Sequence, residues 1–280
     1  MHVQTHGKRI LGKTLALVFL LLLMVVMVFP FIVIVLNSFK TAQDFAQNGP
    51  LGLPETWSMT AIKNFWVRVK YGQKLWNSFS ISLVVAVVAV ILSLLNAFAL
   101  GIGKIKGSVT FLILFVIANT LPQEVLVYPL YYMAKLFGIY DRQISVIIIF
   151  TAIQSAFGTY LLSSSYHAFP RELLEAATVD GCTKGELLTD VVAPVSKPTL
   201  SVLFVFFFLW TWNEFFIPLV MLVSNARQTV PIAISVTQGQ HNMDMTAAAA
   251  SALLGVLPCI IFFAIFQRTL TKGITAGAIK

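Results

Sequence analysis

Acidic side chains gather in one short part of an otherwise apolar chain. Between positions 172 and 190 lie five of its eleven acidic residues: Glu172, Glu175, Asp180, Glu186 and Asp190. With Arg171 they offer charge-assisted hydrogen bonds to a partner in water. Three small neighbours would let that partner approach closely, namely Ala176, Ala177 and Gly181. The charges of residues 168–196, which we call the charged loop, are therefore free to meet a partner in water.

The charged loop carries the signals of two short helices separated by a turn. Pro170 can open the first helix, because its missing N–H would have no partner there anyway. Gly181 can end that helix, and Thr183 can cap a second one. Pro194 and Pro198 are expected to stop the second helix before the next apolar run. The sequence thus predicts a helix–turn–helix between two membrane-spanning segments.

The charged loop resembles the EAA loop of ABC importer permeases. The similarity lies in Glu175-Ala176-Ala177, in Asp180-Gly181 and in Pro194 after a spacer. It is closest to the carbohydrate-importer branch of that family and, within it, to the MalG-like half of the permease pair. Three residues differ from those usual in the branch but keep the docking face apolar: Cys182, Leu188 and Ala193.

This resemblance implies a transport function and a set of partners. It implies a permease subunit of an ATP-driven importer of sugars, in particular oligosaccharides, that forms half of the translocation pathway. Its partners would be a second MalG/MalF-type permease subunit in a heterodimer, two cytoplasmic ATPase subunits and an extracellular or periplasmic sugar-binding protein. ATP and Mg would bind to the ATPases, so this chain would hold no cofactor, no metal and no catalytic residue. The charged loop, from Arg171 to Gly181, would couple the chain to the ATPase.

Two acids lie within or near apolar segments, where a charge is costly. A carboxylate at mid-bilayer costs roughly 2.5–3.5 kcal/mol on insertion scales, so we expect Glu124 and Glu214 to face a cavity or a partner helix. Trp210, Asn213 and Glu214 are three and four residues apart and would share one helix face. This pattern is similar to the Trp-Asn-acid run in the fifth helix of sugar permeases.

The stretch around Glu124 combines polar, aromatic and proline residues. Pro122 frees a backbone carbonyl, and bent backbone at membrane depth is tolerated where it lines water or protein. The candidate pathway residues here are Asn119, Glu124, Tyr128 and Tyr131. These residues could bind a sugar or form hydrogen bonds between helices. In the alternative of an ion-coupled secondary carrier, Glu124 and Glu214 would be the ion sites.

An outer loop and an N-terminal motif complete the candidate sites. The loop at 224–245 contains Gln238, Gln240, His241 and Asn242, and the resemblance implies contact with the sugar-binding protein there. The segment 7–14 fits the phosphate-loop pattern GxxxxGK[ST], but no strand precedes it and an apolar helix follows at once, so we expect no nucleotide binding. An intramembrane enzyme would need a motif such as GxSxG or HExxH, and the sequence has neither.

The composition is that of a membrane protein. Of the 280 residues, 58% are hydrophobic and only 11% charged, against about 25% in soluble domains. The mean hydropathy is +0.86. The net charge of +8 does not indicate nucleic-acid binding, because the basic residues are scattered over loops. Cationic loops that flank membrane helices, in contact with membrane lipid, explain the charge better. The cysteines and histidines have no metal-ligand spacing.

Six apolar segments are long enough to cross a bilayer, which needs about 20 residues. The predicted spans are 15–36, 78–100, 109–133, 144–165, 200–223 and 247–266, with the charged loop between the fourth and fifth. Residues 1–14 and 267–280 would be terminal tails. We therefore expect an all-α polytopic membrane protein of six helices within residues 15–266.

The positive-inside rule orients these spans. With the N-terminus in the cytoplasm, eleven of the nineteen Lys and Arg residues fall on the inner side and three in short outer loops. The remaining five lie in the long first outer loop, which counts for less. This predicts a multi-pass protein of a prokaryotic cell (inner) membrane, with both termini and the charged loop in the cytoplasm.

Overall fold

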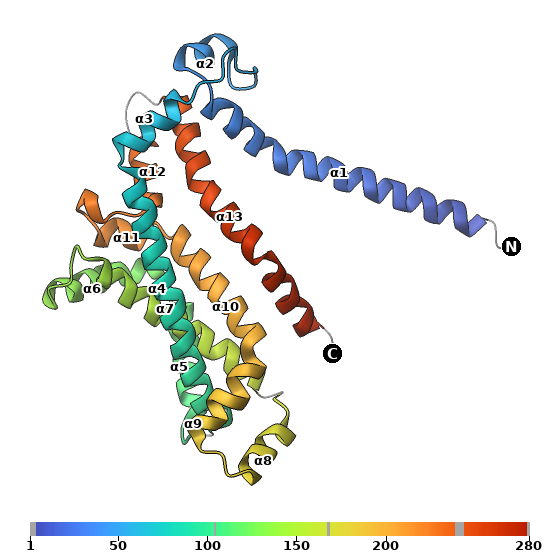
Figure 1. The fold of residues 1–280 in the computed structure, drawn as a ribbon, viewed down its shortest axis with the longest axis vertical. Helices are drawn as coiled ribbons and strands as arrows, with labels where there is room; N and C mark the ends of the chain where they lie inside the picture. The colour runs from blue at the N-terminus through green and yellow to red at the C-terminus, as the bar shows by residue number, and fades with distance from the viewer. Residues whose placement is uncertain (1–3, 104, 167–168, 239–243, 279–280) are drawn as a thin grey trace. The chain divides into compact units, whose positions relative to one another are not determined.

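The computed structural model describes residues 4–103, 105–166, 169–238 and 244–278. Within these residues the chain is helical and contains no β-strand, as expected (Figure 1). The α-helices are α1 Gln4–Ser38, α2 Ala42–Asn48, α3 Thr60–Arg68, α4 Tyr71–Ala97, α5 Ser108–Thr120, α6 Gln123–Leu136, α7 Gln143–Tyr166, α8 Arg171–Val179, α9 Lys184–Glu186, α10 Ala193–Asn213, α11 Phe216–Met221, α12 Val230–Gln238 and α13 Met245–Ala278. Three shorter segments are the π-helices η1 Phe98–Ile102 and η2 Leu187–Val192 and the 3-10 helix η3 Asn225–Arg227.

The chain divides into two compact units. The first comprises Met1–Val69 with Ile234–Leu257, and the second comprises Lys70–Ala233 with Pro258–Lys280. The second unit contains the charged loop and the two stretches around Glu124 and Glu214. It therefore holds most of the candidate functional residues.

In the first unit, a small folded loop follows α1. The fully buried Lys40 donates from Nζ to the carbonyl of Gly49 at 2.7 Å. The carboxylate of Asp44 accepts from the backbone N–H of Glu55 at 3.1 Å. These bonds close the loop around α2 and satisfy both buried charged groups, which would otherwise destabilise it.

Five helices are long and apolar enough to cross a membrane, and one bent pair could form a further span. The five are Gly12–Ser38, Tyr71–Ile102, Gln143–Tyr166, Lys184–Asn213 and Met245–Arg268. The pair α5 and α6 is bent by 99° between Thr120 and Gln123. Counted as one span, this pair brings the number to the six that the sequence predicts.

The bend between α5 and α6 lies within the third predicted span, 109–133, at the proline where the sequence predicted bent backbone. Leu121 has extended backbone, with φ −68° and ψ 128°, and Pro122 follows it. A proline disfavours helical backbone in the residue before it and lacks the N–H that would continue the helix. The proline therefore separates two helices instead of merely bending one.

Helices α4 and α7 share the most extensive helix contact of the second unit, and small residues line it. A Cβ atom on Gly158 would lie 2.8 Å from Cβ of Ser93 and 2.9 Å from Cζ of Phe207. The hydroxyl of Ser93 donates to the backbone carbonyl of Ala89 at 2.6 Å. It also lies 3.3 Å from the backbone carbonyl oxygen of Ser155 on α7. Such small residues and short hydroxyl bonds let membrane helices approach closely.

Helix α10 joins this pair through a buried polar contact. Nε2 of Gln154 on α7 donates to Oγ1 of Thr211 on α10 at 2.8 Å, and both side chains are buried. In Figure 1 the charged loop, with α8 and α9, lies beyond one end of α4, α7 and α10. The three helices therefore form the scaffold that carries the charged loop.

At the other end of α4, polar groups hold residues 224–230 in place. We call this set the polar clasp: Lys74, Asn77, Ser78, Asp141 and residues 224–230. The fully buried Lys74 donates from Nζ to the backbone and side-chain oxygens of Asn225, the latter at 2.9 Å. Asn77 donates to two backbone carbonyls of the segment, each at 2.9 Å. The hydroxyl oxygen of Ser78 accepts from the backbone N–H of Val230 at 2.8 Å.

Asp141 completes the polar clasp from the turn between α6 and α7. Its carboxylate accepts from the backbone N–H of Ser224 at 2.9 Å, from the hydroxyl of Ser224, and from the guanidinium of Arg227 at 3.1 Å. Burial raises the pKa of Asp141, but the bonds from Ser224 and the charge of Arg227 outweigh it and hold the pKa below its usual value. The clasp is therefore strongest when Asp141 is ionised.

Candidate functional site

The charged loop begins with helix α8, which ends as the sequence predicts. Gly181 has φ +80°, a left-handed conformation in which a residue with a Cβ is strained. The N–H of Cys182 reaches the carbonyl of Ala177 at 3.0 Å, and that of Gly181 reaches the carbonyl of Thr178 at 3.1 Å. These bonds satisfy carbonyls that the helix end would leave open.

The second helix of the loop also starts as predicted. Oγ1 of Thr183 accepts from the backbone N–H of Glu186 at 3.3 Å, and the carboxylate of Glu186 accepts from the N–H of Thr183 at 2.7 Å. This reciprocal pair is a capping box. Local residue choice thus defines the turn and both helix ends around it.

The second helix does not stop at Pro194 and Pro198, and that expectation was wrong. Residues Lys184–Asn213 form one continuous helical segment of 30 residues. The π-helix η2 lies just before Pro194, and its wider turn pairs the N–H of Ala193 with the carbonyl of Leu188. Pro194 then occupies the first turn of α10, where a missing N–H is tolerated. The charged loop is therefore continuous with a membrane helix.

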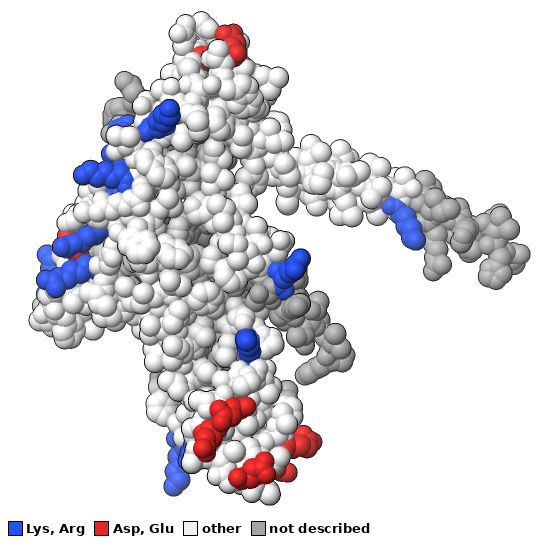
Figure 2. Space-filling view, viewed as in Figure 1, with Lys and Arg blue, Asp and Glu red and all other residues white. Residues whose placement is uncertain are grey.

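Most of the predicted docking residues are exposed. The side chains of Arg171, Glu172, Glu175 and Asp180 face solvent, as do Ala176 and Gly181. None of these four charged groups forms an ion pair with another described residue. Figure 2 shows acidic side chains over the part of the molecule that carries α8 and α9. Ala177 differs, because it is buried within this chain and packs inwards instead of facing a partner.

A cavity of about 420 Å³ lies beneath helix α8. Gly101 and Ile102 of η1 line one side, and Leu174 and Glu175 of α8 line another. Tyr166 forms part of the floor; its ring lies edge-on to that of Phe169 at 5.9 Å, and its hydroxyl bonds to Ser196 at 3.1 Å. Helix α8 is therefore only partly packed against its own chain.

The predicted face of Trp210, Asn213 and Glu214 is interrupted. Trp210 and Asn213 are helical, but Glu214 leaves the helix with φ −71° and ψ 130°. Its carboxylate accepts from the N–H of Phe216 at 3.2 Å, at the start of α11. A carboxylate at a helix start is favoured by the open N–H groups there. The expected span to residue 223 is accordingly divided into α10 and α11.

Glu124, like Glu214, lies at the start of a short helix that follows a break. Glu124 lies in the first turn of α6 and is exposed. Asn119 donates within α5 to Phe115, Tyr128 is exposed, and Tyr131 packs edge-on against Tyr140 at 4.9 Å. Tyr131 therefore belongs to internal packing.

The short helices that follow the two acid-bearing breaks are in contact. Helices α6 and α11 pack against each other in one apolar cluster that includes Val127, Ala134, Ile217 and Met221. Each carries its acid at or before its first turn. Broken helices packed against each other are a common way to build a polar site at membrane depth.

The outer-loop candidates lie mostly beyond the described residues. Gln238 is the last residue of α12, whereas Gln240, His241 and Asn242 fall outside the described part of the chain. Within that part, no group of His, Cys, Asp and Glu residues could hold a metal ion.

Sequence reasoning missed the polar clasp and Gln154. Lys74, Asn77 and Ser78 are spaced by three and four residues and so share one face of α4, a signal that was available in the sequence. Their partners at positions 225–230 lie about 150 residues later and carried no such signal.

Comparison with known proteins identifies the family. Residues 97–276 match the family model of the binding-protein-dependent transport system inner membrane component. The inner membrane ABC transporter permease protein YcjP of Escherichia coli is 28% identical, over 93% of this chain and 94% of its own. The diacetylchitobiose uptake system permease protein DasC of Streptomyces coelicolor is 29% identical, over 98% and 99%.

A solved structure shares the fold. It is a chain of a bacterial ABC transporter involved in import of the acidic polysaccharide alginate, with a TM-score of 0.76 and 21% identity, covering 94% of this chain and 97% of that one. The family match covers the charged loop, both acid-bearing breaks and most of the helices described above. This chain belongs to the family of binding-protein-dependent transport system inner membrane components, and it is a multi-pass membrane protein.

Proposed function

We propose that this chain is the permease subunit of an ATP-driven sugar importer and that its charged loop docks on a cytoplasmic ATPase. The substrate class is inferred from relatives, since DasC is named for diacetylchitobiose uptake and the transporter with the same fold imports alginate. The ion-coupled carrier is set aside, because the family consists of transport components that depend on a binding protein.

One observation carries the coupling proposal: the charged loop and the candidate pathway share a continuous helix. The segment Lys184–Asn213 starts at the capping box of the charged loop and ends beside Glu214. At 1.5 Å per residue its 30 residues span about 45 Å. A displacement of α8 and α9 by an ATPase would be transmitted along this helix to the break at Glu214, as a rigid-body step of alternating access.

The proposal includes a topology and a set of partners. Both termini and the charged loop lie in the cytoplasm of a prokaryotic cell, and the six spans cross its (inner) membrane. The importer contains a second permease subunit in a heterodimer, two ATPase subunits that bind ATP and Mg, and an extracellular or periplasmic binding protein. The unpaired charges of Arg171, Glu172, Glu175 and Asp180 support docking, because no described residue of this chain forms an ion pair with them.

Charge reversal at Glu175 tests the docking. In the reconstituted importer, Glu175→Lys should reduce sugar uptake about tenfold or more, since breaking one charge-assisted contact costs roughly 1.5–3 kcal/mol. ATP hydrolysis should persist, no longer stimulated by the sugar-loaded binding protein. The matched control is Glu55→Lys, on the loop that follows α1. Unchanged uptake in Glu175→Lys would remove the docking proposal.

The polar residues at the two helix breaks are candidates for the sugar pathway. We propose that Asn213, Glu214 and Glu124 line the sugar pathway at the two breaks. Asn213→Ala and Glu214→Gln should lower uptake while the subunits still copurify. If both variants transport normally, these residues only stabilise helix ends, and docking by the charged loop is unaffected.

A further inference from the structure

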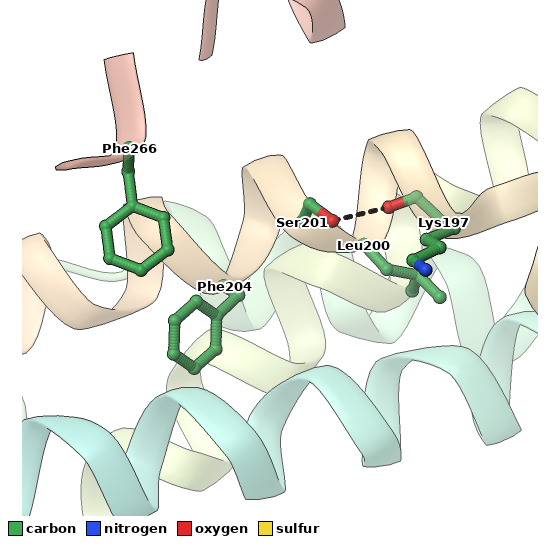
Figure 3. A pocket seen from close by; sticks show the side chains of 5 residues that line it. All are labelled: Lys197, Leu200, Ser201, Phe204 and Phe266. Atoms are coloured by element: carbon green, nitrogen blue, oxygen red, sulfur yellow. Dashed lines mark hydrogen bonds between the residues drawn. The ribbon is translucent and has the colours of Figure 1, made fainter. Parts of the chain in front are cut away.

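A groove between α10 and α13 combines apolar walls with a single basic residue. Its lining consists of Leu200, Ser201 and Phe204 with Lys197 on α10, and Phe266 on α13 (Figure 3). The four α10 residues have the spacing i, i+3, i+4 and i+7, so they form one stripe along that helix. Lys197 is at the end of the stripe nearest the charged loop. We propose that this groove binds an anionic phospholipid, with the phosphate at Lys197 and an acyl chain along Phe204 and Phe266.

The aromatic residues form the closed end of the groove. The rings of Phe204 and Phe266 are 6.1 Å apart, and those of Phe208 and Phe262 stack at 4.0 Å. These ring pairs join α10 to α13. Towards Lys197 no such pair is present among the groove-lining residues, and a cavity of about 250 Å³ remains. At about 30 Å³ per water molecule, this volume corresponds to about eight waters. It can therefore hold part of a lipid but not a whole one.

Both walls change from apolar to basic on the same side of the Phe204–Phe266 pair. Along α10, Lys197 precedes a run without charged residues that extends to Asn213. Along α13, residues 245–266 carry no charge, and Arg268 follows two positions after Phe266. Such a change marks the boundary between hydrocarbon and headgroups. The groove therefore crosses the level at which a lipid changes from acyl chain to phosphate.

The charge of Lys197 selects the class of lipid. Its side chain is exposed, and no described residue forms an ion pair with it. The hydroxyl of Ser201 is already used, since it donates to the carbonyl of Lys197 at 2.8 Å. An unpaired ammonium above an apolar groove matches an anionic headgroup better than a zwitterionic one. Around the groove, Ile261, Phe263 and Ile265 are exposed on α13, as expected for a surface in contact with lipid.

Retention of lipid by the assembled importer tests the proposal. The complex is purified from membranes containing phosphatidylglycerol and phosphatidylcholine, and the bound lipids are counted by native mass spectrometry. The parent should retain phosphatidylglycerol preferentially. Lys197→Ala should lower its retention about fivefold, as expected for one basic residue at a membrane surface, whereas Lys197→Arg should keep it. The control Lys106→Ala, an exposed lysine between α4 and α5, should behave as the parent.

A second measurement identifies what occupies the groove. A photoreactive benzophenone residue placed at Phe204 should form adducts with phospholipid in the assembled complex. Adducts with another protein subunit instead would overturn the proposal, because the groove would then be covered by protein. Equal retention of the two lipids, or no effect of Lys197→Ala, would overturn it as well, since only non-specific lipid would be bound. None of these outcomes depends on whether the charged loop docks on an ATPase.

Discussion

Replacing Gly158 by alanine tests the close packing of α4 and α7. The new Cβ would lie within 3.0 Å of atoms of both Ser93 and Phe207. Neither neighbour can move easily, because Ser93 is short and doubly hydrogen-bonded and Phe207 is fully buried. Overpacking of this kind costs about 1–3 kcal/mol. Alanine gains up to about 1 kcal/mol over glycine in a helix, so we expect a net loss of about 1 kcal/mol.

The assay is equilibrium unfolding of the purified permease by SDS in mixed micelles, followed by circular dichroism. The control is Gly185→Ala in α9, where the nearest atom, Oγ1 of Thr183, lies 3.9 Å from the added Cβ. This control should be neutral or slightly stabilised. The sign of the change in the free energy of unfolding is the critical result. A Gly158→Ala protein as stable as the parent, or more stable, would show that the two helices can separate at low cost.

A compensating change adds a further check. Ser93→Gly removes the two Ser93 atoms that lie nearest the new Cβ and keeps the contact with Phe207. The double variant with Gly158→Ala should therefore lose less stability than the sum of the single losses, by about 1 kcal/mol or more. Strict additivity would place the strain elsewhere.

Three further predictions concern the polar clasp and the charged loop. Lys74→Met should destabilise the protein by about 1–3 kcal/mol in SDS titration, because two oxygens of Asn225 lose their donor. The backbone at Asp141 has φ +56°, which asparagine also tolerates, so Asp141→Asn tests the charge alone. The parent should be more stable than this variant above about pH 4. The difference in the free energy of unfolding should vanish as the pH falls through the lowered pKa of Asp141. Gly181→Ala should strain the turn after α8 by about 1–2 kcal/mol, seen as faster hydrogen exchange at the N–H of Cys182.

Each of these predictions has a contradicting result. If Lys74→Met unfolds like the parent, water replaces the ammonium and the clasp does not depend on it. A stability difference between the parent and Asp141→Asn that stays constant down to pH 2 would show that ionisation of Asp141 is irrelevant. Unchanged exchange at Cys182 in Gly181→Ala would mean that the turn has alternative conformations.

Local signals in the sequence predicted the elements whose hydrogen bonds are local. The number of apolar spans follows from hydropathy over about 20 residues. The turn after α8 follows from Gly181, and the start of α9 follows from Thr183 and Glu186, since all partners lie within five residues. The proline rule was misapplied at Pro194, because a π-helix before it accommodates the missing N–H. The same rule correctly marked Pro122 as a point of bending, although the bend is sharper than expected.

The tertiary structure alone decided the features that depend on distant residues. Lys74 meets Asn225, Asp141 meets Arg227, and Gln154 meets Thr211, at separations of 151, 86 and 57 residues. The burial of Ala177 and the groove at Phe266 have the same origin, since both depend on which helices become neighbours. Hydropathy and capping act over a few residues and are readable along the chain. Pairing between helices depends on the topology of the whole bundle, which no short stretch of sequence encodes.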